Sequence, residues 1–216
     1  EYTNYTSEEL LQLIEENIDV LDETAILRAA TLVKDNDQKV AIYKKAAEKY
    51  ESAVAKYNMA VTYLAMDKVA KAEAALEGLA QDADWNNAKG VIALRNNDLE
   101  AAAKYFAAAG NETAKENAAV LDILNGEYEA AAAKLAGVEG YNAALAQLLN
   151  KDYAGALNTI KSIGNDGDGV TDYIRALISA RQGNSYAANT YLKDAISKDA
   201  SLATYAENDL EFNNVK

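Results

Sequence analysis

Residues 141–156 read Tyr-Asn-Ala-Ala-Leu-Ala-Gln-Leu-Leu-Asn-Lys-Asp-Tyr-Ala-Gly-Ala, and this stretch decides the fold. Ala144 stands twelve places before Ala156, and the polar turn 150–152 lies between them. Two antiparallel helices that pack closely need a small side chain on each helix where the backbones approach. Gly or Asn ends a helix well, and Asp or Asn begins one by capping its free amides. The stretch therefore predicts a helical hairpin.

The same pattern occurs five times without gaps, which indicates a repeat architecture. Each copy has a small residue twelve places before an Ala, with a polar turn between the two. The pairs are Ala60 and Ala72, Gly90 and Ala102, Ala119 and Ala131, Ala144 and Ala156, and Ala176 and Ala188. Apolar residues, large in every copy at the nearer place, follow four and seven places after the second Ala, so they share one face of the second helix. The residues four positions after each second-helix Ala are Leu76, Phe106, Leu135, Ile160 and Leu192.

The apolar periodicity predicts helices along the whole chain, in one domain spanning residues 1–216. The clearest repeats cover 51–198, acidic helices occupy 1–37, and 200–212 is expected to form a capping helix. We expect Leu202, Tyr205, Ala206 and Leu210 of that helix to cover the last repeat. The predicted helices lie near 7–20, 23–34, 37–50, 51–65, 68–80, 84–95, 98–109, 111–124, 127–136, 139–149, 152–163, 169–182, 185–198 and 200–212.

The composition argues against several classes of function. The sequence has no Cys and no His, so it has no thiol nucleophile, no thiolate or imidazole metal ligand and no ordinary near-neutral acid–base group. A net charge of −13 argues against nucleic-acid binding. No apolar run approaches the roughly 20 residues of a membrane span. We therefore expect no cofactor, no metal, no catalytic residue, no nucleic acid and no membrane insertion.

The negative charge is concentrated at the start of the sequence. Residues 1–37 carry ten acidic side chains against Arg28 and Lys34, a balance of −8, and the other residues together carry −5. A basic partner could dock on this acidic region. A solvated face that keeps the terminal helices soluble is the alternative, and the sequence favours it.

These residues resemble the tetratricopeptide repeat, in which a small residue on the first helix pairs with Ala on the second across a Gly-Asp-Tyr-like turn. Residues 125–131 (Asn-Gly-Glu-Tyr-Glu-Ala-Ala) and 150–156 match it best. The resemblance covers 51–198, and more loosely 23–50, where Tyr43 and Ala46 fit a second helix. It implies an all-α, right-handed α-solenoid of about six helical hairpins. The second-helix Ala residues are 30, 29, 25 and 32 places apart, short of the usual value of about 34, and Pro is absent, so the units are expected to be trimmed and irregular.

The resemblance also implies where a partner binds, because the first helices of such hairpins line a concave groove. The family's best-known groove grips a peptide carboxylate with Lys, Arg and Asn, but here those places hold mostly Tyr and aliphatic residues. Four residues after each of the first-helix positions 57, 87, 116, 141 and 173, about one helical turn on, stand Val61, Val91, Val120, Leu145 and Leu177. The expected partner-binding residues, exposed on the concave side, are Tyr57, Asn87, Glu116, Tyr141 and Tyr173, with Arg95 and Arg181 near the ends of their helices.

A groove of Tyr and aliphatic side chains suits a peptide or an apolar helical segment of a partner. We therefore predict a non-catalytic protein-interaction scaffold, although the same residues could simply pack between repeats. The alternatives are a structural spacer or self-associating module of a larger envelope protein, and an α/α-toroid glycan-acting enzyme that would use Asp122 and Glu116. Residues 165–169 (Asn-Asp-Gly-Asp-Gly) look briefly like a calcium loop but lack its distal Glu. The absence of Cys and a start at Glu1 suggest a processed bacterial periplasmic or envelope protein, with a cytoplasmic one as the alternative.

Overall fold

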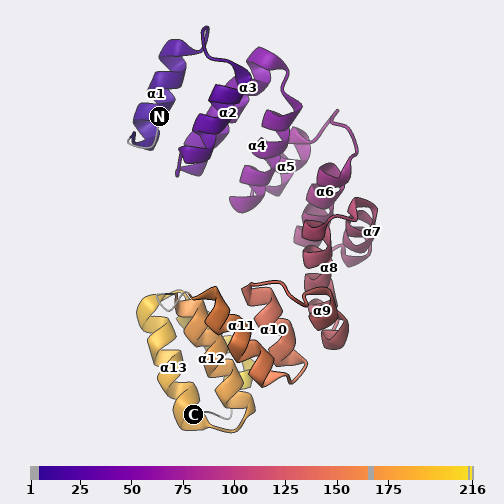
Figure 1. The fold of residues 1–216 in the computed structure, drawn as a ribbon, viewed down its shortest axis with the longest axis vertical. Helices are drawn as coiled ribbons and strands as arrows, with labels where there is room; N and C mark the ends of the chain where they lie inside the picture. The colour runs from indigo at the N-terminus through magenta and orange to yellow at the C-terminus, as the bar shows by residue number, and fades with distance from the viewer. Residues whose placement is uncertain (1–4, 165–167, 214, 216) are drawn as a thin grey trace. The chain divides into compact units, whose positions relative to one another are not determined.

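The computed structural model describes residues 5–164, 168–213 and 215. Within these residues the chain forms fourteen α-helices and one short 3₁₀ helix, and no strand (Figure 1). The helices are α1 (Ser7–Asn17), α2 (Glu23–Leu32), α3 (Asn36–Tyr50), α4 (Ala53–Ala65), α5 (Val69–Ala75), α6 (Ala83–Arg95), α7 (Leu99–Ala109), α8 (Glu112–Leu124), α9 (Tyr128–Lys134), α10 (Tyr141–Leu149), α11 (Tyr153–Ile163), α12 (Gly169–Arg181), α13 (Ser185–Lys198), α14 (Leu202–Asn208) and η1 (Leu210–Phe212).

The chain divides into two compact units, residues 1–114 and 115–216. In a repeat array each repeat contacts mainly its neighbours, so such a division need not be a domain boundary. One domain over residues 1–216 therefore stays a prediction, and each unit is described by itself.

The first unit contains α1 and the hairpins α2–α3, α4–α5 and α6–α7. Tyr43 and Ala46 are buried in α3, which confirms the hairpin expected in residues 23–50. Helix α1 buries Leu10 and Ile14 in the same core cluster, while its acidic side chains, such as Glu15, remain exposed. This arrangement favours the solvated-face interpretation of the acidic region.

The second unit contains all but the first turn of α8, then α9, α10–α11 and α12–α13, followed by α14 and η1. Helices α10, α11, α12 and α13 lie side by side (Figure 1). Its largest core cluster contains Leu148, Ile160, Ile174 and Ile178, and the buried Phe212 of η1 belongs to it. Together the two units hold the six hairpins and the terminal helix that the sequence predicted.

The turn inside each repeated hairpin has the same backbone structure. After Leu149, for example, the Lys151 amide donates to the Leu148 carbonyl (3.0 Å) and the Asp152 amide to the Gln147 carbonyl (2.8 Å). This is the pattern that closes a helix through one left-handed residue. That residue is Asp67, Asn97, Gly126, Lys151 and Gly183 in the five turns, with φ of 57°, 59°, 80°, 65° and 74°. The repeat read from the sequence is therefore a repeat in the structure.

The expected side-chain caps of the second helices form in only some hairpins. Asp98, Asp152 and Asn184 each accept a hydrogen bond from the backbone amide three residues on. Lys68 and Glu127 occupy the same place in the other two hairpins and make no side-chain cap. An ammonium cannot accept a hydrogen bond, and Glu is a poorer cap than Asp or Asn.

The ten small residues of the repeat are all buried, as the packing argument predicted. Gly90 differs from the other four first-helix residues because it faces Phe106. A Cβ added at Gly90 would lie 2.4 Å from Phe106 Cε1. The bulkiest second-helix side chain is thus matched by the smallest first-helix residue.

The C-terminal end corrects the prediction of one capping helix over 200–212. Helix α14 ends at Asn208, because Asp209 adopts an extended conformation and its side chain accepts from the Glu211 amide to begin η1. Leu202 is buried as expected, whereas Tyr205 and Leu210 are exposed. Because the helix is interrupted at Asp209, Phe212 is buried instead of Tyr205 and Leu210.

Candidate functional site

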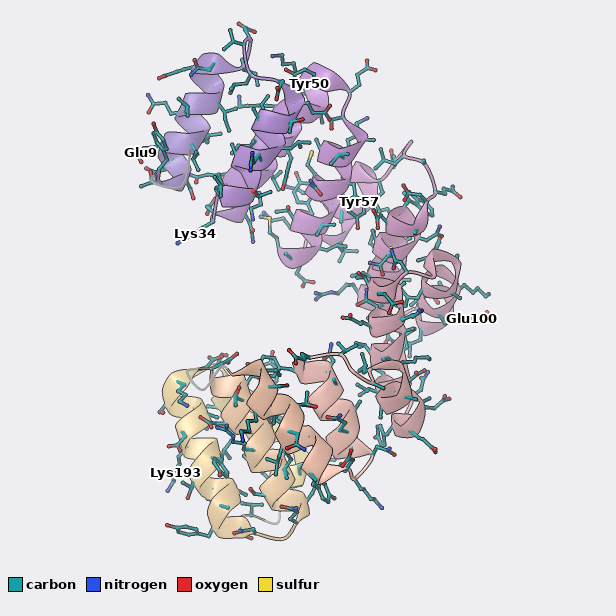
Figure 2. The ribbon with its side chains drawn as sticks, in the orientation of Figure 1. Glu9, Lys34, Tyr50, Tyr57, Glu100 and Lys193 are labelled. Atoms are coloured by element: carbon teal, nitrogen blue, oxygen red, sulfur yellow. The ribbon has the colours of Figure 1, made fainter. Side chains whose placement is uncertain are left out.

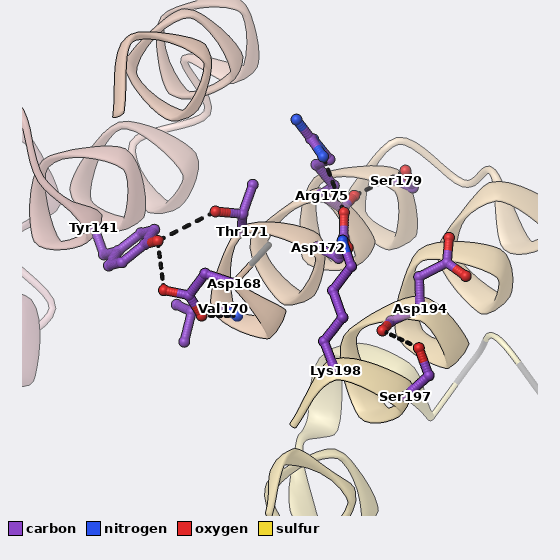
Figure 3. Close-up of polar contacts among 10 residues, drawn as sticks. All are labelled: Tyr141, Asp168, Val170, Thr171, Asp172, Arg175, Ser179, Asp194, Ser197 and Lys198. Atoms are coloured by element: carbon purple, nitrogen blue, oxygen red, sulfur yellow. Dashed lines mark hydrogen bonds and ion pairs between the residues drawn. The ribbon is translucent and has the colours of Figure 1, made fainter. Parts of the chain in front are cut away.

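Tyr141, at the start of α10, is hydrogen-bonded to the residue that begins α12, the first helix of the next hairpin (Figure 3). Its hydroxyl donates to Asp168 Oδ2 at 2.7 Å, and Thr171 Oγ1 lies 3.2 Å from the same hydroxyl oxygen. Asp168 also caps α12 by accepting from the Val170 amide at 2.9 Å. The Tyr141 hydrogen bond, and then the Val170 amide, hold the pKa of Asp168 below its usual range.

Tyr173, the equivalent residue of α12, makes the same kind of contact with the C-terminal end. Its hydroxyl donates to Asp209 Oδ2 at 2.9 Å, and its ring meets Phe212 edge to face with centroids 5.5 Å apart. Burial, and then the bond to Asp209, raise the pKa of the Tyr173 phenol well above its usual range. Arg181 pairs with Glu211 through two hydrogen bonds of 3.0 and 2.5 Å. Two predicted partner-binding residues thus anchor the chain's own C-terminal segment.

Tyr141 and Tyr173 are therefore partly structural, as the packing alternative proposed. The Tyr141 hydroxyl donates to Asp168, which begins α12, and the Tyr173 hydroxyl donates to Asp209, which begins η1. Their rings nevertheless line an apolar groove of about 750 Å³. The groove floor includes Leu145 of α10 and Leu177 of α12, both of which belong to the row expected one turn further on.

Helix α14 forms a wall of this groove, which the sequence did not reveal. Leu202, Tyr205 and Asn208 line it from that side. Tyr205 is 68% exposed, so its ring is available to a binding partner. The groove of the second unit, made by α10, α12 and α14, is hereafter called the C-terminal groove.

The other expected residues lie elsewhere. Asn87 is only 9% exposed on α6, so the expectation that its side chain is open to a partner is wrong; the helix turns that position toward the core. Arg95 is exposed and pairs with Asp67 of the preceding turn at 3.2 Å. Glu116 is exposed on α8 and Tyr57 is half-buried on α4. Of the seven, only Tyr141 and Tyr173 line the C-terminal groove.

An ion-pair cluster around the buried Asp172 was not anticipated. Asp172 of α12 is 4% exposed and accepts from Arg175 Nη1 at 2.9 Å and from Lys198 Nζ at 2.5 Å (Figure 3). Lys198 is the last residue of α13, so the cluster ties the two helices together. No spacing rule links residues 172 and 198, and only the packed hairpin brings them together.

The structure adds little in favour of metal or catalytic chemistry. Among the described residues, no group of three or more His, Cys, Asp or Glu side chains could hold a metal ion. Residues 165–167 of the calcium-like loop lie outside the described residues, and Asp168 is engaged by Tyr141 and Val170. Asp122, considered for a toroidal enzyme, pairs with Lys134 at 2.5 Å. Within the described part of the chain, no helix has the length and hydropathy needed to cross a bilayer.

No protein-family model matches the sequence, and the comparison with curated proteins gives no significant match. Solved structures do match. A tetratricopeptide repeat protein from Parabacteroides merdae ATCC 43184 aligns over 97% of this chain and 90% of its own, with a TM-score of 0.63 and 15% identity. The chain has a tetratricopeptide-like fold. YrrB, a TPR protein with an unusual peptide-binding site, aligns over 94% of this chain and 100% of its own at 20% identity. Its TM-score of 0.38 is too low to support any argument about a tetratricopeptide-like site here.

Proposed function

We propose that this chain is a non-catalytic protein-interaction scaffold that holds an apolar, helical segment of a partner in the C-terminal groove. The observation that supports this proposal most strongly is the groove itself. Its volume is about 750 Å³, and Leu145, Leu177 and Leu202 line it together with the rings of Tyr141 and Tyr173. Sites that bind ligands are concave and mostly apolar, with a few polar groups that fix orientation.

The helical surroundings of the groove favour a bound helix over strand addition. An amphipathic helix places anchors at i, i+3, i+4 and i+7 into a hydrophobic groove. Strand addition would need an open sheet edge, and the described residues form helices only. Asn142 and Asn208 line the groove together with the apolar residues, and their amides can bond to the polar flank of a bound helix.

The chemistry of the groove supports a binding role over catalysis. The carboxylate of Asp209 lines the groove but accepts the Tyr173 hydroxyl. The neighbouring Asp168 accepts the Tyr141 hydroxyl, which lowers its pKa and keeps it a weak base. Tyr173 holds its proton far above neutral pH. These groups are set to orient helices rather than to exchange protons.

Self-association is the second candidate, because Tyr186, Tyr205 and Leu210 leave large apolar surfaces exposed. Light scattering on the size-fractionated chain separates the two: a monomer at micromolar concentration excludes a self-associating module. We also propose action in the bacterial cell envelope, which fractionation of the source cells would test.

The binding proposal is tested with helical peptides selected from a displayed library against the whole chain. Tyr205→Ala removes a ring that lines the groove, whereas Tyr186→Ala removes an even more exposed ring on α13 that does not line it. A central aromatic anchor is worth about 2 kcal/mol, so Tyr205→Ala should weaken binding by about 30-fold and Tyr186→Ala should leave it unchanged. Equal affinities for both variants would contradict the proposal. Tyr141 and Tyr173 are unsuitable targets because their hydroxyls also hold helices.

A further inference from the structure

A smaller hollow lies within the first unit, between α4 and α6. Its volume is about 310 Å³, near the lower end for small-ligand sites. Its described lining includes two carboxylates and no Lys or Arg. The residues that matter to the argument are Val54, Tyr57, Leu79, Asp82, Asp84 and Trp85.

Tyr57 differs here from its two equivalents in the second unit (Figure 2 labels it on α4). Tyr141 and Tyr173 donate to the Asp that begins the next helix. Asp82 begins α6 in the same way and, like Asp168 and Asp209, accepts a backbone amide, that of Trp85 at 2.9 Å. The Tyr57 hydroxyl, however, has no hydrogen-bond partner among the residues that the structure describes. Burial, and then Asp84 and Asp82, raise the pKa of Tyr57. The hollow beside Tyr57 thus lies where the other two hairpins have a hydrogen bond between the Tyr hydroxyl and the Asp.

The lining has the chemistry of a cation site. Indole and phenol faces attract ammonium and guanidinium groups, and carboxylates add to this attraction. Lys89 shows the effect from outside the lining: its Nζ lies 5.8 Å from the Trp85 ring centroid while it pairs with Glu73 at 2.5 Å. Val54 and Leu79 offer apolar contact to the methylene stem of a long basic side chain.

We infer that this pocket binds one Lys or Arg side chain from a basic segment of a partner protein. Charge complementarity selects that occupant, because two acidic groups and two aromatic rings line the hollow without a basic residue. The inference does not depend on the C-terminal groove, and either site can fail without the other.

Trp85 is the only tryptophan in the sequence, so its fluorescence reports on the pocket directly. The probe is the blocked peptide Ala-Ala-Lys-Ala-Ala, and its control is the same peptide with the lysine Nε-acetylated. The full chain is titrated with each. The lysine peptide should give a saturable change that weakens as salt is added, since the pocket carboxylates are exposed. The acetylated peptide should give none.

Two variants that each remove one negative charge from the first unit complete the test. Asp84→Asn removes a pocket carboxylate without touching the α6 cap, whereas Asp19→Asn removes an exposed charge outside the pocket lining. An exposed charge pair is worth up to about 1 kcal/mol, so Asp84→Asn should weaken lysine binding about two- to five-fold. Asp19→Asn should not change it. An equal response to the acetylated peptide, no response to the lysine peptide, or equal behaviour of the two variants would overturn the inference.

Discussion

Gly90 and Phe106 offer the sharpest test of the packing. In the other four hairpins the first-helix residue is Ala and its second-helix counterpart is Leu or Ile. Here a Cβ on residue 90 would lie 2.4 Å from Phe106 Cε1 and 2.5 Å from Cδ1. Carbon atoms in contact prefer about 3.5–4.0 Å. The ring therefore fills the space that an Ala methyl would need.

The expected cost follows from two opposing effects. Overpacking a core costs about 1–3 kcal/mol, and an overlap of roughly 1 Å belongs at the upper end. Ala is better than Gly within a helix by about 1 kcal/mol. Gly90→Ala should therefore reduce the free energy of unfolding by about 2 kcal/mol, so that the clash outweighs the helix propensity.

Phe106→Leu should abolish or reverse the loss of stability that Gly90→Ala causes. With both substitutions in place, the hairpin would carry the same Ala and Leu side chains as the pair Ala60 and Leu76. Gly90→Ala in the Phe106→Leu background should therefore be neutral or stabilising by up to about 1 kcal/mol. Urea unfolding followed by circular dichroism gives the four free energies of this double-mutant cycle. We expect a coupling of about 2–3 kcal/mol, and additivity of the two changes within about 0.5 kcal/mol would refute the reasoning.

Three further outcomes are expected. Lys151→Gly should stabilise the chain by about 0.5–1 kcal/mol in urea unfolding, because φ at this turn is 65°; a loss of stability would contradict the shared turn. Glu127→Asp should raise the unfolding midpoint by supplying the missing cap, worth about 1 kcal/mol. The pKa of Tyr173 is raised in the folded state, so the stability that its phenol contributes to the fold is complete below about pH 10, the ordinary tyrosine pKa. That stability is lost as the pH rises from there through the pKa of the folded state. Unfolding free energies across alkaline pH should therefore fall less steeply in Tyr173→Phe.

Local patterns in the sequence were enough to predict the hairpins. Helix α12 was expected at 169–182 and runs from Gly169 to Arg181, because the turn signals on either side are short-range. Leu145 and Leu177 were placed on the groove face by counting helical turns from Tyr141 and Tyr173, and the structure brings these four together. Periodicity and turn chemistry act over a few residues, so they can be read from the chain.

Contacts between distant residues could not be read in this way. Tyr173 and Asp209 are 36 residues apart, and their bond depends on where α14 breaks. The apolar spacing of residues 202–210 favoured one helix with Tyr205 buried, but Asp209 competes for the backbone and begins η1 instead. The third wall of the C-terminal groove therefore appears only in the folded chain.

The binding role of the C-terminal groove is tested most directly by site-specific photo-crosslinking in the native cells. A photoreactive phenylalanine analogue replaces Tyr205, which lines the groove, or Tyr186, which does not. We predict one discrete protein adduct from position 205 and none of that mass from position 186, with the crosslink mapped by mass spectrometry to a helical, apolar segment of the partner. The same adducts from both positions, or an adduct from position 186 alone, would contradict the account.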